Sequence, residues 1–451
     1  MSAQYVKDMT EGNETKLLIS FSIPMIIGNI FQQFYNMVDS IIVGNFVGAN
    51  ALAAVGATGS LNFLFFSLCS GMSMGVGILI SQYFGAKNED NVRKTIANSI
   101  YIIAAVSILM SILGILFSRV ILQFLNTPAA IIDDSAAYMK ITCGGILAIG
   151  GYNAISAILR ALGDSKTPLV FLIVASLLNV VLDLLFVLQF GMGVRGVGYA
   201  TIIAQAVAAV GCLIFALMKN PYFRIKKEHL RFDPEIAVKC MKLGLPIAAQ
   251  SSLIAISCVA LQSVVNKFGE GVVAAFTATS RIEQLVQQPY NSLGAAVSTF
   301  TGQNMGAGKL DRVKKGFHKS IIMVVIFSIA MLLLIYTNNR AIISLFVKDE
   351  AVIAIGATAI RITSMMFMPL GLIYVTRGLL NGAGDAVYSV INGSVEIIGR
   401  IGFSNILVLI PTIGQWGIWW ATGLTWVIVA SASLIRYKQG KWKTKTVIGR
   451  K

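Results

Sequence analysis

Acidic and amide side chains inside long apolar runs are the strongest chemical signal in this chain. Asp39 lies late in the first such run, and Asn179 and Asp183 lie in the run LVFLIVASLLNVVLDLLFVLQF. A carboxylate within a bilayer is costly, and such residues usually face a cavity or an ion path. The spacing therefore predicts a cation site that involves both aspartates.

Two hydroxyl groups are expected at the same membrane depth. The first and fifth runs should cross outward, so Asp39 and Asp183 fall in their outer parts, and Asn179 shares a helical face with Asp183. Tyr138 and Thr201 lie early in the fourth and sixth runs. These oxygens could hold a proton, or Na⁺ at Asp39, Asn179, Asp183 and Thr201. In the alternative, Tyr138, Asn179 and Thr201 only bond neighbouring helices.

The composition indicates a membrane protein. Of 451 residues, 56% are hydrophobic and 12% charged, with a mean hydropathy of +0.76. A soluble protein of this size needs more charge to cover its surface. The net charge of +16 is concentrated in KNPYFRIKKEHLRFD, GKLDRVKKGFHK and RYKQGKWKTKTVIGRK, between and after the apolar runs. This is the pattern of cytoplasmic loops, so we expect a multi-pass inner-membrane (cytoplasmic-membrane) protein with both termini cytoplasmic and no nucleic-acid partner.

Twelve apolar runs are long enough to cross a bilayer as helices. They cover residues 17–45, 57–83, 96–118, 136–159, 168–190, 197–218, 243–266, 274–302, 320–345, 353–378, 388–411 and 417–436. The predicted organisation is a cytoplasmic N-terminus (1–16), an N-lobe (17–218), a cytoplasmic linker (219–242), a C-lobe (243–436) and a basic tail (437–451).

The two halves repeat. SQYFGAKNEDNVRK matches TGQNMGAGKLDRVKK, and Gly85 and Gly306 are 221 positions apart (306 minus 85). The same offset relates RALGDSKTP to NGAGDAVYS, while Pro24 and Pro246 differ by 222. Six crossings per unit give both units the same orientation. The sequence therefore predicts an all-α integral membrane fold, with two parallel-repeat six-helix lobes around a central cavity.

The second half lacks the acids of the first. By the repeat offsets, the residues at the positions of Asp39, Asn179 and Asp183 are Leu261, Arg400 and Ser404. An arginine repels a cation, so we expect the coupling site in the first half only. Glu396 and Arg400 are spaced i, i+4 and should form a neutralising pair on one helix; in the alternative, Glu396 lines the cavity and attracts a cationic substrate.

A substrate cavity needs polar contacts and an adaptable apolar surface. The candidates are Glu283, Gln250, Gln287, Gln288, Tyr35, Phe34, Met366 and Phe367. The alternative for each is a lipid-facing or packing role.

Several enzymatic readings are excluded by the motifs. Five cysteines are irregularly spaced, and the two histidines lie in basic loops, so neither a disulfide framework nor a histidine metal centre is expected. No Walker sequence occurs, and the GxGxxG match at 191–196 follows a membrane run. Gly71 and Gly75 should form a helix-packing face. We expect no enzymatic activity and no cofactor.

The chain resembles the multidrug and toxic compound extrusion (MATE) family over nearly its whole length. The resemblance rests on PMIIGNIFQQFYNMVDSIIVGNFVGANALAAVGATG, on the paired QYFGA and QNMGA segments, and on LRALGDSKTP. It implies a twelve-helix antiporter that expels cationic amphiphilic drugs in exchange for H⁺ or Na⁺, and we expect it to act as a monomer. The alternatives are a lipid-linked oligosaccharide flippase of the same architecture and, further away, a channel.

Within that family the first-half pattern resembles the DinF-like branch. The resemblance assigns cation coupling to Asp39, Tyr138, Asn179, Asp183 and Thr201. The NorM-like branch also uses acids in helices seven and ten. Here helix seven has none, and Leu370 occupies the tenth-helix acid position, which argues against a second coupling site.

Overall fold

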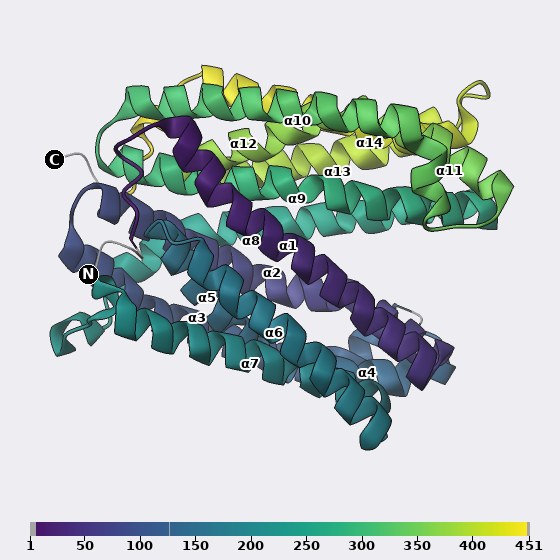
Figure 1. Ribbon diagram of the computed structural model, residues 1–451, viewed down its shortest axis with the longest axis horizontal. Coiled ribbons are helices and arrows are strands. Elements are labelled where there is room, and N and C mark those ends of the chain that lie inside the picture. The colour runs from purple at the N-terminus through teal and green to yellow at the C-terminus, as the bar shows by residue number, and fades with distance from the viewer. Residues whose placement is uncertain (1–5, 126, 449–451) are drawn as a thin grey trace. The chain divides into compact units, whose positions relative to one another are not determined.

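The computed structural model describes residues 6–125 and 127–448, and every regular element in this part of the chain is helical (Figure 1). The α-helices are α1 (Glu14–Ile42), α2 (Ala49–Gly85), α3 (Glu89–Phe124), α4 (Ala129–Gly144), α5 (Ile146–Ala161), α6 (Lys166–Leu184), α7 (Gly193–Lys219), α8 (Pro234–Val265), α9 (Glu270–Gly306), α10 (Leu310–Ser344), α11 (Glu350–Ser364), α12 (Phe367–Ala383), α13 (Val387–Leu407) and α14 (Gly417–Lys438).

The chain divides into two compact units, and two of the three boundaries between them along the sequence fall inside helices. The first unit comprises the residues up to Met9 and Ile23–Ala248, and the second comprises Thr10–Ser22 and Ala249–Lys451. The first two turns of α1 therefore belong to the second unit, and the N-terminal half of α8 belongs to the first. The two changes of unit at Ser22 and Ala248 fall within three residues of a proline, Pro24 or Pro246, where a helix loses a hydrogen bond and bends easily.

Two of the twelve predicted crossings are broken helices. The fourth run forms α4 and α5, which meet at Gly145 with a bend of 45°, and the tenth forms α11 and α12, with a bend of 49°. The sequence predicts both runs as continuous, and no proline lies near the break at Gly145. The tenth run does carry Pro369, in the first turn of α12, where a proline removes a helical hydrogen bond to the residue four before it and favours a break. Gly145 and Met366 are 221 positions apart, so both breaks occupy the same place in the repeat. The bend is thus a feature of the repeated unit.

The helices that carry Asp39 and Asp183 both end in a π-helical turn. The π-helical segment η1 (Val43–Val47) continues α1, and η2 (Leu185–Gln189) continues α6. Such turns widen the backbone and are enriched at functional sites. No π-helical segment follows α8 or α13, the corresponding helices of the second half, in the described residues. The π-helical turns therefore occur only in the half of the chain that carries the two aspartates, and they are not a feature of the repeated unit.

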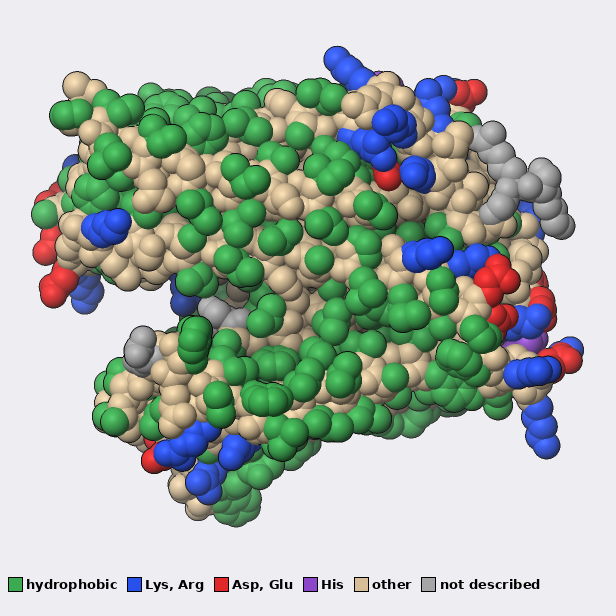
Figure 2. All heavy atoms as spheres, turned by 180° about the vertical axis from the view of Figure 1, so that it is seen from behind, with side chains coloured by type: hydrophobic (Ala, Val, Ile, Leu, Met, Phe, Trp, Pro, Cys, Tyr) green, Lys and Arg blue, Asp and Glu red, His purple; other side chains and the backbone are tan. Residues whose placement is uncertain are grey.

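The hydropathy of the helices agrees with a membrane protein. Eight helices are long and apolar enough to span a bilayer, and the two bent pairs raise the number to ten among the described residues. α9 and α13 are more polar, yet they coincide with the two remaining predicted runs. Figure 2 shows apolar side chains over most of the visible face, with Lys and Arg gathered toward the ends of the helices. Phe124 and Leu116 are 85% and 66% exposed, which suits contact with lipid better than contact with water.

Glycines allow the closest helix contacts in each unit. A Cβ atom on Gly75 would lie 2.6 Å from the backbone nitrogen of Gly244, and one on Gly71 would lie 2.6 Å from that of Ala248. The predicted packing face of α2 is therefore confirmed, and its partner is α8. In the second unit, Gly378 of α12 packs directly on the carbonyl group of Gly294 in α9.

Replacing Gly378 by alanine should destabilise the second unit by about 1–3 kcal/mol, the usual cost of overpacking. The added Cβ overlaps the Gly294 carbonyl oxygen, which belongs to backbone and cannot rotate away. Gly402→Ala is the matched control, since nothing lies within 4 Å of its Cβ and alanine is favoured over glycine inside a helix by roughly 0.5–1 kcal/mol. Thermal unfolding in detergent should show a lower Tm for Gly378→Ala alone. Equal Tm values for the two variants would contradict the packing described here.

Candidate functional site

The two aspartates that the sequence singled out lie in contact in the first unit. The carboxyl groups of Asp39 on α1 and Asp183 on α6 lie close enough to interact directly. Asp183 is fully buried, and the Oδ1 atom of Asp39 is buried without a hydrogen-bond partner among the described residues. Two ionised carboxylates this close repel each other, so a shared proton, or a cation in its place, would stabilise the contact.

Four polar side chains surround the acid pair. Tyr35 lies one turn before Asp39 and beside Thr201 of α7, and both Tyr35 and Tyr138 of α4 lie close enough to the two aspartates to interact electrostatically. The amide nitrogen of Asn179 donates to Thr201 Oγ1 at 3.5 Å. The structure therefore brings all five predicted coupling residues together. It adds Tyr35, which the sequence analysis had assigned to the substrate cavity. We call Tyr35, Asp39, Tyr138, Asn179, Asp183 and Thr201 the acid cluster.

Helical spacing places the members of the acid cluster. Tyr35 and Asp39 are four residues apart on α1, and Asn179 and Asp183 are four apart on α6, so each pair shares one face. An apolar cluster that includes Ile42, Val187 and Tyr138 packs against the same helix ends. The cluster offers only oxygen and amide groups, a set suited to a proton or a hard cation. No group of three or more His, Cys, Asp or Glu occurs within the described residues.

The second unit contains a polar cavity of about 370 Å³. Its lining includes Leu261, Arg400 and Thr422, which correspond by the repeat offsets to Asp39, Asn179 and Thr201. The same place in the repeat thus holds acids in the first unit and an arginine in the second. Ser404, at the position of Asp183, is buried and donates to the backbone oxygen of Ile401.

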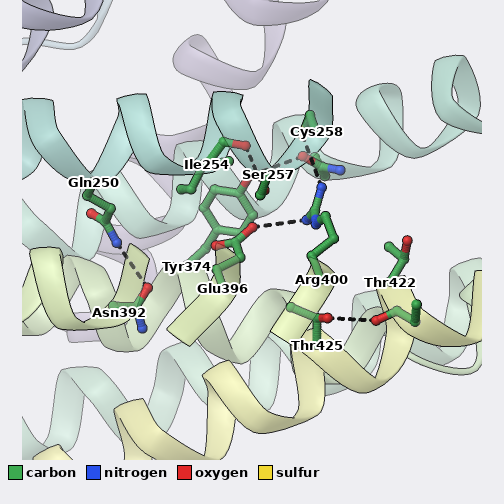
Figure 3. Close-up of polar contacts among 12 residues, drawn as sticks. Gln250, Ile254, Ser257, Cys258, Tyr374, Asn392, Glu396, Arg400, Thr422 and Thr425 are labelled. Carbon is green, nitrogen blue, oxygen red and sulfur yellow. Dashed lines mark hydrogen bonds and ion pairs between the residues drawn. The ribbon is translucent and has the colours of Figure 1, made fainter. Parts of the chain in front are cut away.

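Three charged residues, Arg377, Glu396 and Arg400, line this cavity as one ion network, and Figure 3 shows its Glu396–Arg400 pair. Glu396 Oε1 pairs with Arg400 Nη2 at 3.0 Å, and Glu396 Oε2 lies 3.5 Å from Arg377 Nη2. Arg377 also donates to Asn392 Oδ1 at 2.6 Å, and Arg400 Nη1 lies 3.0 Å from Cys258 Sγ. The predicted Glu396–Arg400 pair is confirmed. Arg377 was missed, because its partner is on another helix and no spacing in the sequence links the two.

The remaining cavity candidates divide into two groups. Glu283 and Gln287 line the cavity from one face of α9, and Tyr374 donates to Gln287 Oε1 at 3.2 Å. The five that do not line it are Gln250, Gln288, Phe34, Met366 and Phe367.

For each of these five residues, the structure shows why its side chain does not line the cavity. Gln250 is buried and donates to Asn392 Oδ1 at 2.9 Å, and Gln288 donates to the backbone oxygen of Gln284. Phe367 is completely buried beside Trp426, so it is a packing residue. Met366 packs against Gly423. Phe34 is 56% exposed on α1 and does not point into the acid cluster that Tyr35 joins.

Comparison with known proteins identifies the family to which this architecture belongs. A family profile described as MatE matches residues 24–185 and 246–403, one segment in each half. The chain belongs to the MatE family. The two matched segments begin at Pro24 and Pro246, the same pair that relates the halves at an offset of 222.

Relatives of this MatE chain extend over its full length. It is 30% identical to "Probable multidrug resistance protein YpnP" of Bacillus subtilis (strain 168), over 97% of both chains. It is 28% identical to "Probable multidrug resistance protein YoeA" of the same organism, over 95% of this chain and 94% of that one. Among solved structures, a transporter of the MOP superfamily from Pyrococcus furiosus shares the fold with a TM-score of 0.91 at 23% identity, over 97% of this chain and 98% of that one. The fold is therefore that of a membrane transporter.

Proposed function

We propose that this MatE protein is a multidrug efflux antiporter, which exports cationic amphiphilic compounds in exchange for H⁺ or Na⁺. The relatives named as multidrug resistance proteins support the efflux activity. The observation that carries the coupling is the direct approach of the buried Asp183 to Asp39 on another helix. In this proposal the protein is a multi-pass protein of the cytoplasmic membrane, works as a monomer, and keeps both termini in the cytoplasm.

The acid pair offers a physical route from ion binding to movement. With a proton or Na⁺ present, Asp39 and Asp183 attract each other and hold α1 against α6. Without it, two negative charges at this distance in a medium of low dielectric repel strongly. The helix ends beyond the acids are π-helical turns, η1 and η2, whose bonding is less regular than that of an α-helix. Loss of the ion would therefore loosen α1 from α6.

Antiport then follows from differential affinity. An ion that binds only when α1 and α6 are together favours one conformation, and a substrate that binds better when they are apart favours the other. Binding of the ion then lowers the apparent affinity of the protein for the substrate, and binding of the substrate lowers its apparent affinity for the ion. In this scheme the lobes 17–218 and 243–436 move as two bodies, and the acid cluster in the N-lobe determines which opening predominates.

The hydroxyl and amide groups of the acid cluster distinguish H⁺ from Na⁺ as the coupling ion. A proton needs only the two carboxylates, whereas Na⁺ needs several oxygens, which Asn179, Thr201 and Tyr138 could add. Replacing Thr201 by valine removes one oxygen at nearly constant size. A proton-coupled protein should keep most of its activity after this change, and a sodium-coupled protein should lose most of it.

The proposed coupling is tested by dye efflux from proteoliposomes under separately imposed gradients. Purified protein is reconstituted, a cationic dye is loaded, and a proton gradient, a sodium gradient or neither is applied. We expect at least one of the two ion gradients to accelerate the movement of dye in the direction opposite to the flow of that ion. Equal rates in all three conditions would contradict ion-coupled antiport, and a current without exchange would indicate a channel.

A further inference from the structure

The cavity of the second unit has a charge pattern unlike that of the acid cluster. Its titratable lining includes two arginines, Arg377 and Arg400, and two glutamates, Glu283 and Glu396. Glu396 is within 4 Å of both arginines, so these three residues form one network with a formal charge of +1. Glu283, on α9, brings the total formal charge of the four to zero. A cavity built only to attract organic cations would not need the two arginines.

Arg400 has more hydrogen-bond donors than it uses. Its side chain is 9% exposed, and a guanidinium group carries five N–H donors. Nη2 donates to Glu396 and Nη1 to the sulfur of Cys258, a weak acceptor. Nε is buried without a hydrogen-bond partner among the described residues. A buried donor without an acceptor is costly, and a carboxylate in the cavity would supply the missing acceptor oxygens.

Glu283 provides the opposite charge across a gap. It lies close enough to Arg400 to interact electrostatically, and Thr363 lies beside it. No ion pair within 4 Å joins it to Arg400 in the described part of the chain. Glu283 shares its face of α9 with Ser280, Gln284 and Gln287, which also line the cavity. An ammonium group there would find a carboxylate and further acceptor oxygens.

Aromatic rings complete the lining. Phe276, Tyr374, Trp419 and Trp426 all border the cavity. The indole of Trp419 is held by a hydrogen bond to Thr279 Oγ1 at 3.1 Å, and its ring lies 6.2 Å from that of Phe276. A volume near 370 Å³ is within the range of sites for drug-sized molecules.

We propose that this cavity binds small aromatic zwitterions, with the anionic group on Arg400, the ammonium group on Glu283 and the ring among the tryptophans. An organic cation would satisfy Glu283 but leave the donors of Arg400 unmet, and an organic anion would do the reverse. Whether such a ligand is also exported rests on the proposed function, but its binding does not.

The test uses three ligands with one aromatic body and different charges. Nε-dansyl-L-lysine is a zwitterion, its α-methyl ester keeps only the ammonium group, and its Nα-acetyl derivative keeps only the carboxylate. All five tryptophans lie in the second unit, so energy transfer from tryptophan to the dansyl group in detergent reports binding there. We expect the zwitterion to bind about tenfold more tightly than either derivative, since each lost charged hydrogen bond is worth roughly that factor.

Variants then assign the preference to the two residues. Arg400→Gln should remove the advantage of the zwitterion over the methyl ester, and Glu283→Gln should remove its advantage over the acetyl derivative. Arg361→Gln is the matched control, because Arg361 is exposed and packs over the ring of Tyr336, outside the cavity lining. It should leave all three affinities unchanged. Equal or tighter binding of the methyl ester by the unmodified protein would overturn the proposal, as would equal binding of the acetyl derivative.

A second readout needs no variant and keeps the test valid if Arg400→Gln does not fold. Cys258 lines the cavity and is exposed, whereas the four other cysteines are buried. Nε-dansyl-L-lysine should slow alkylation of Cys258 by N-ethylmaleimide, and the methyl ester at the same concentration should not. Equal protection by both would overturn the proposal. Neither readout involves transport, so a failure of the proposed efflux function would leave both results unchanged.

Discussion

Asp39→Asn and Asp183→Asn should each abolish resistance to cationic dyes in cells that express the protein at the normal level. Asparagine keeps the size and the hydrogen-bonding capacity of aspartate but carries no charge and releases no proton. The proposed site for H⁺ or Na⁺ between the two side chains would therefore be lost. We expect the efflux rate to fall by about tenfold or more, equivalent to ~1.4 kcal/mol or more. Growth in dye and initial efflux rates measure the loss.

The matched control is Asp133→Asn. Asp133 is also an aspartate of the first unit, but it is 77% exposed and pairs with Arg119 at the surface, where an ion pair contributes little. This variant should retain full resistance. Because the two cluster acids act as one unit, the Asp39→Asn, Asp183→Asn double variant should be no worse than either single one. Full resistance of either single variant at equal expression would contradict the assigned role.

Glu396→Gln should lower the stability of the second unit by about 3 kcal/mol, near the lower end for breaking a buried ion pair. The change leaves Arg377 and Arg400 without their shared carboxylate in a site where Glu396 is 6% and Arg400 is 7% exposed. Asn392, which still accepts from Arg377, compensates in part. Thermal unfolding of the purified protein in detergent measures the effect.

Two further variants separate charge from packing. Glu350→Gln removes a carboxylate that pairs with Arg340 at the surface of the same unit, and it should change stability by less than about 1 kcal/mol. Adding Arg400→Gln to Glu396→Gln removes one of the two uncompensated charges. The double variant should therefore be more stable than Glu396→Gln alone. A double variant that is less stable than the single one would show that packing, and not charge, dominates this network.

The membrane fold could be predicted because its signals are local. Apolar runs and the repeat offset of 221 follow directly from residue types and positions, and each predicted run corresponds to a helix or a bent pair. The break at Gly145 could not be predicted in the same way, because no proline lies near it and its tight contact with Ile202 of α7 depends on tertiary packing. The break at Met366 does have a local signal, Pro369 in the first turn of α12, which the prediction of a continuous run did not use.

The candidate site shows the same division between local and tertiary information. Asp39, Asn179 and Asp183 were identified because charge and amide groups are rare in apolar runs, and their depth followed from the run boundaries. Tyr35 and Phe34 are adjacent, yet only Tyr35 joins the acid cluster. The i, i+4 spacing of Tyr35 and Asp39 places both on one face of α1, so the sequence contained the signal that distinguishes Tyr35 from Phe34. Arg377 was missed for a different reason, since Glu396 approaches it from another helix.

The most direct test of the central claim compares gradient-driven with gradient-free dye efflux in proteoliposomes that contain the unmodified protein, Asp39→Asn or Asp133→Asn. If the acid pair couples ion movement to export, an imposed proton or sodium gradient accelerates efflux by the unmodified protein and by Asp133→Asn, and has no effect on Asp39→Asn. Equal acceleration of Asp39→Asn by the same gradient would contradict the account, because the ion would then act at another site.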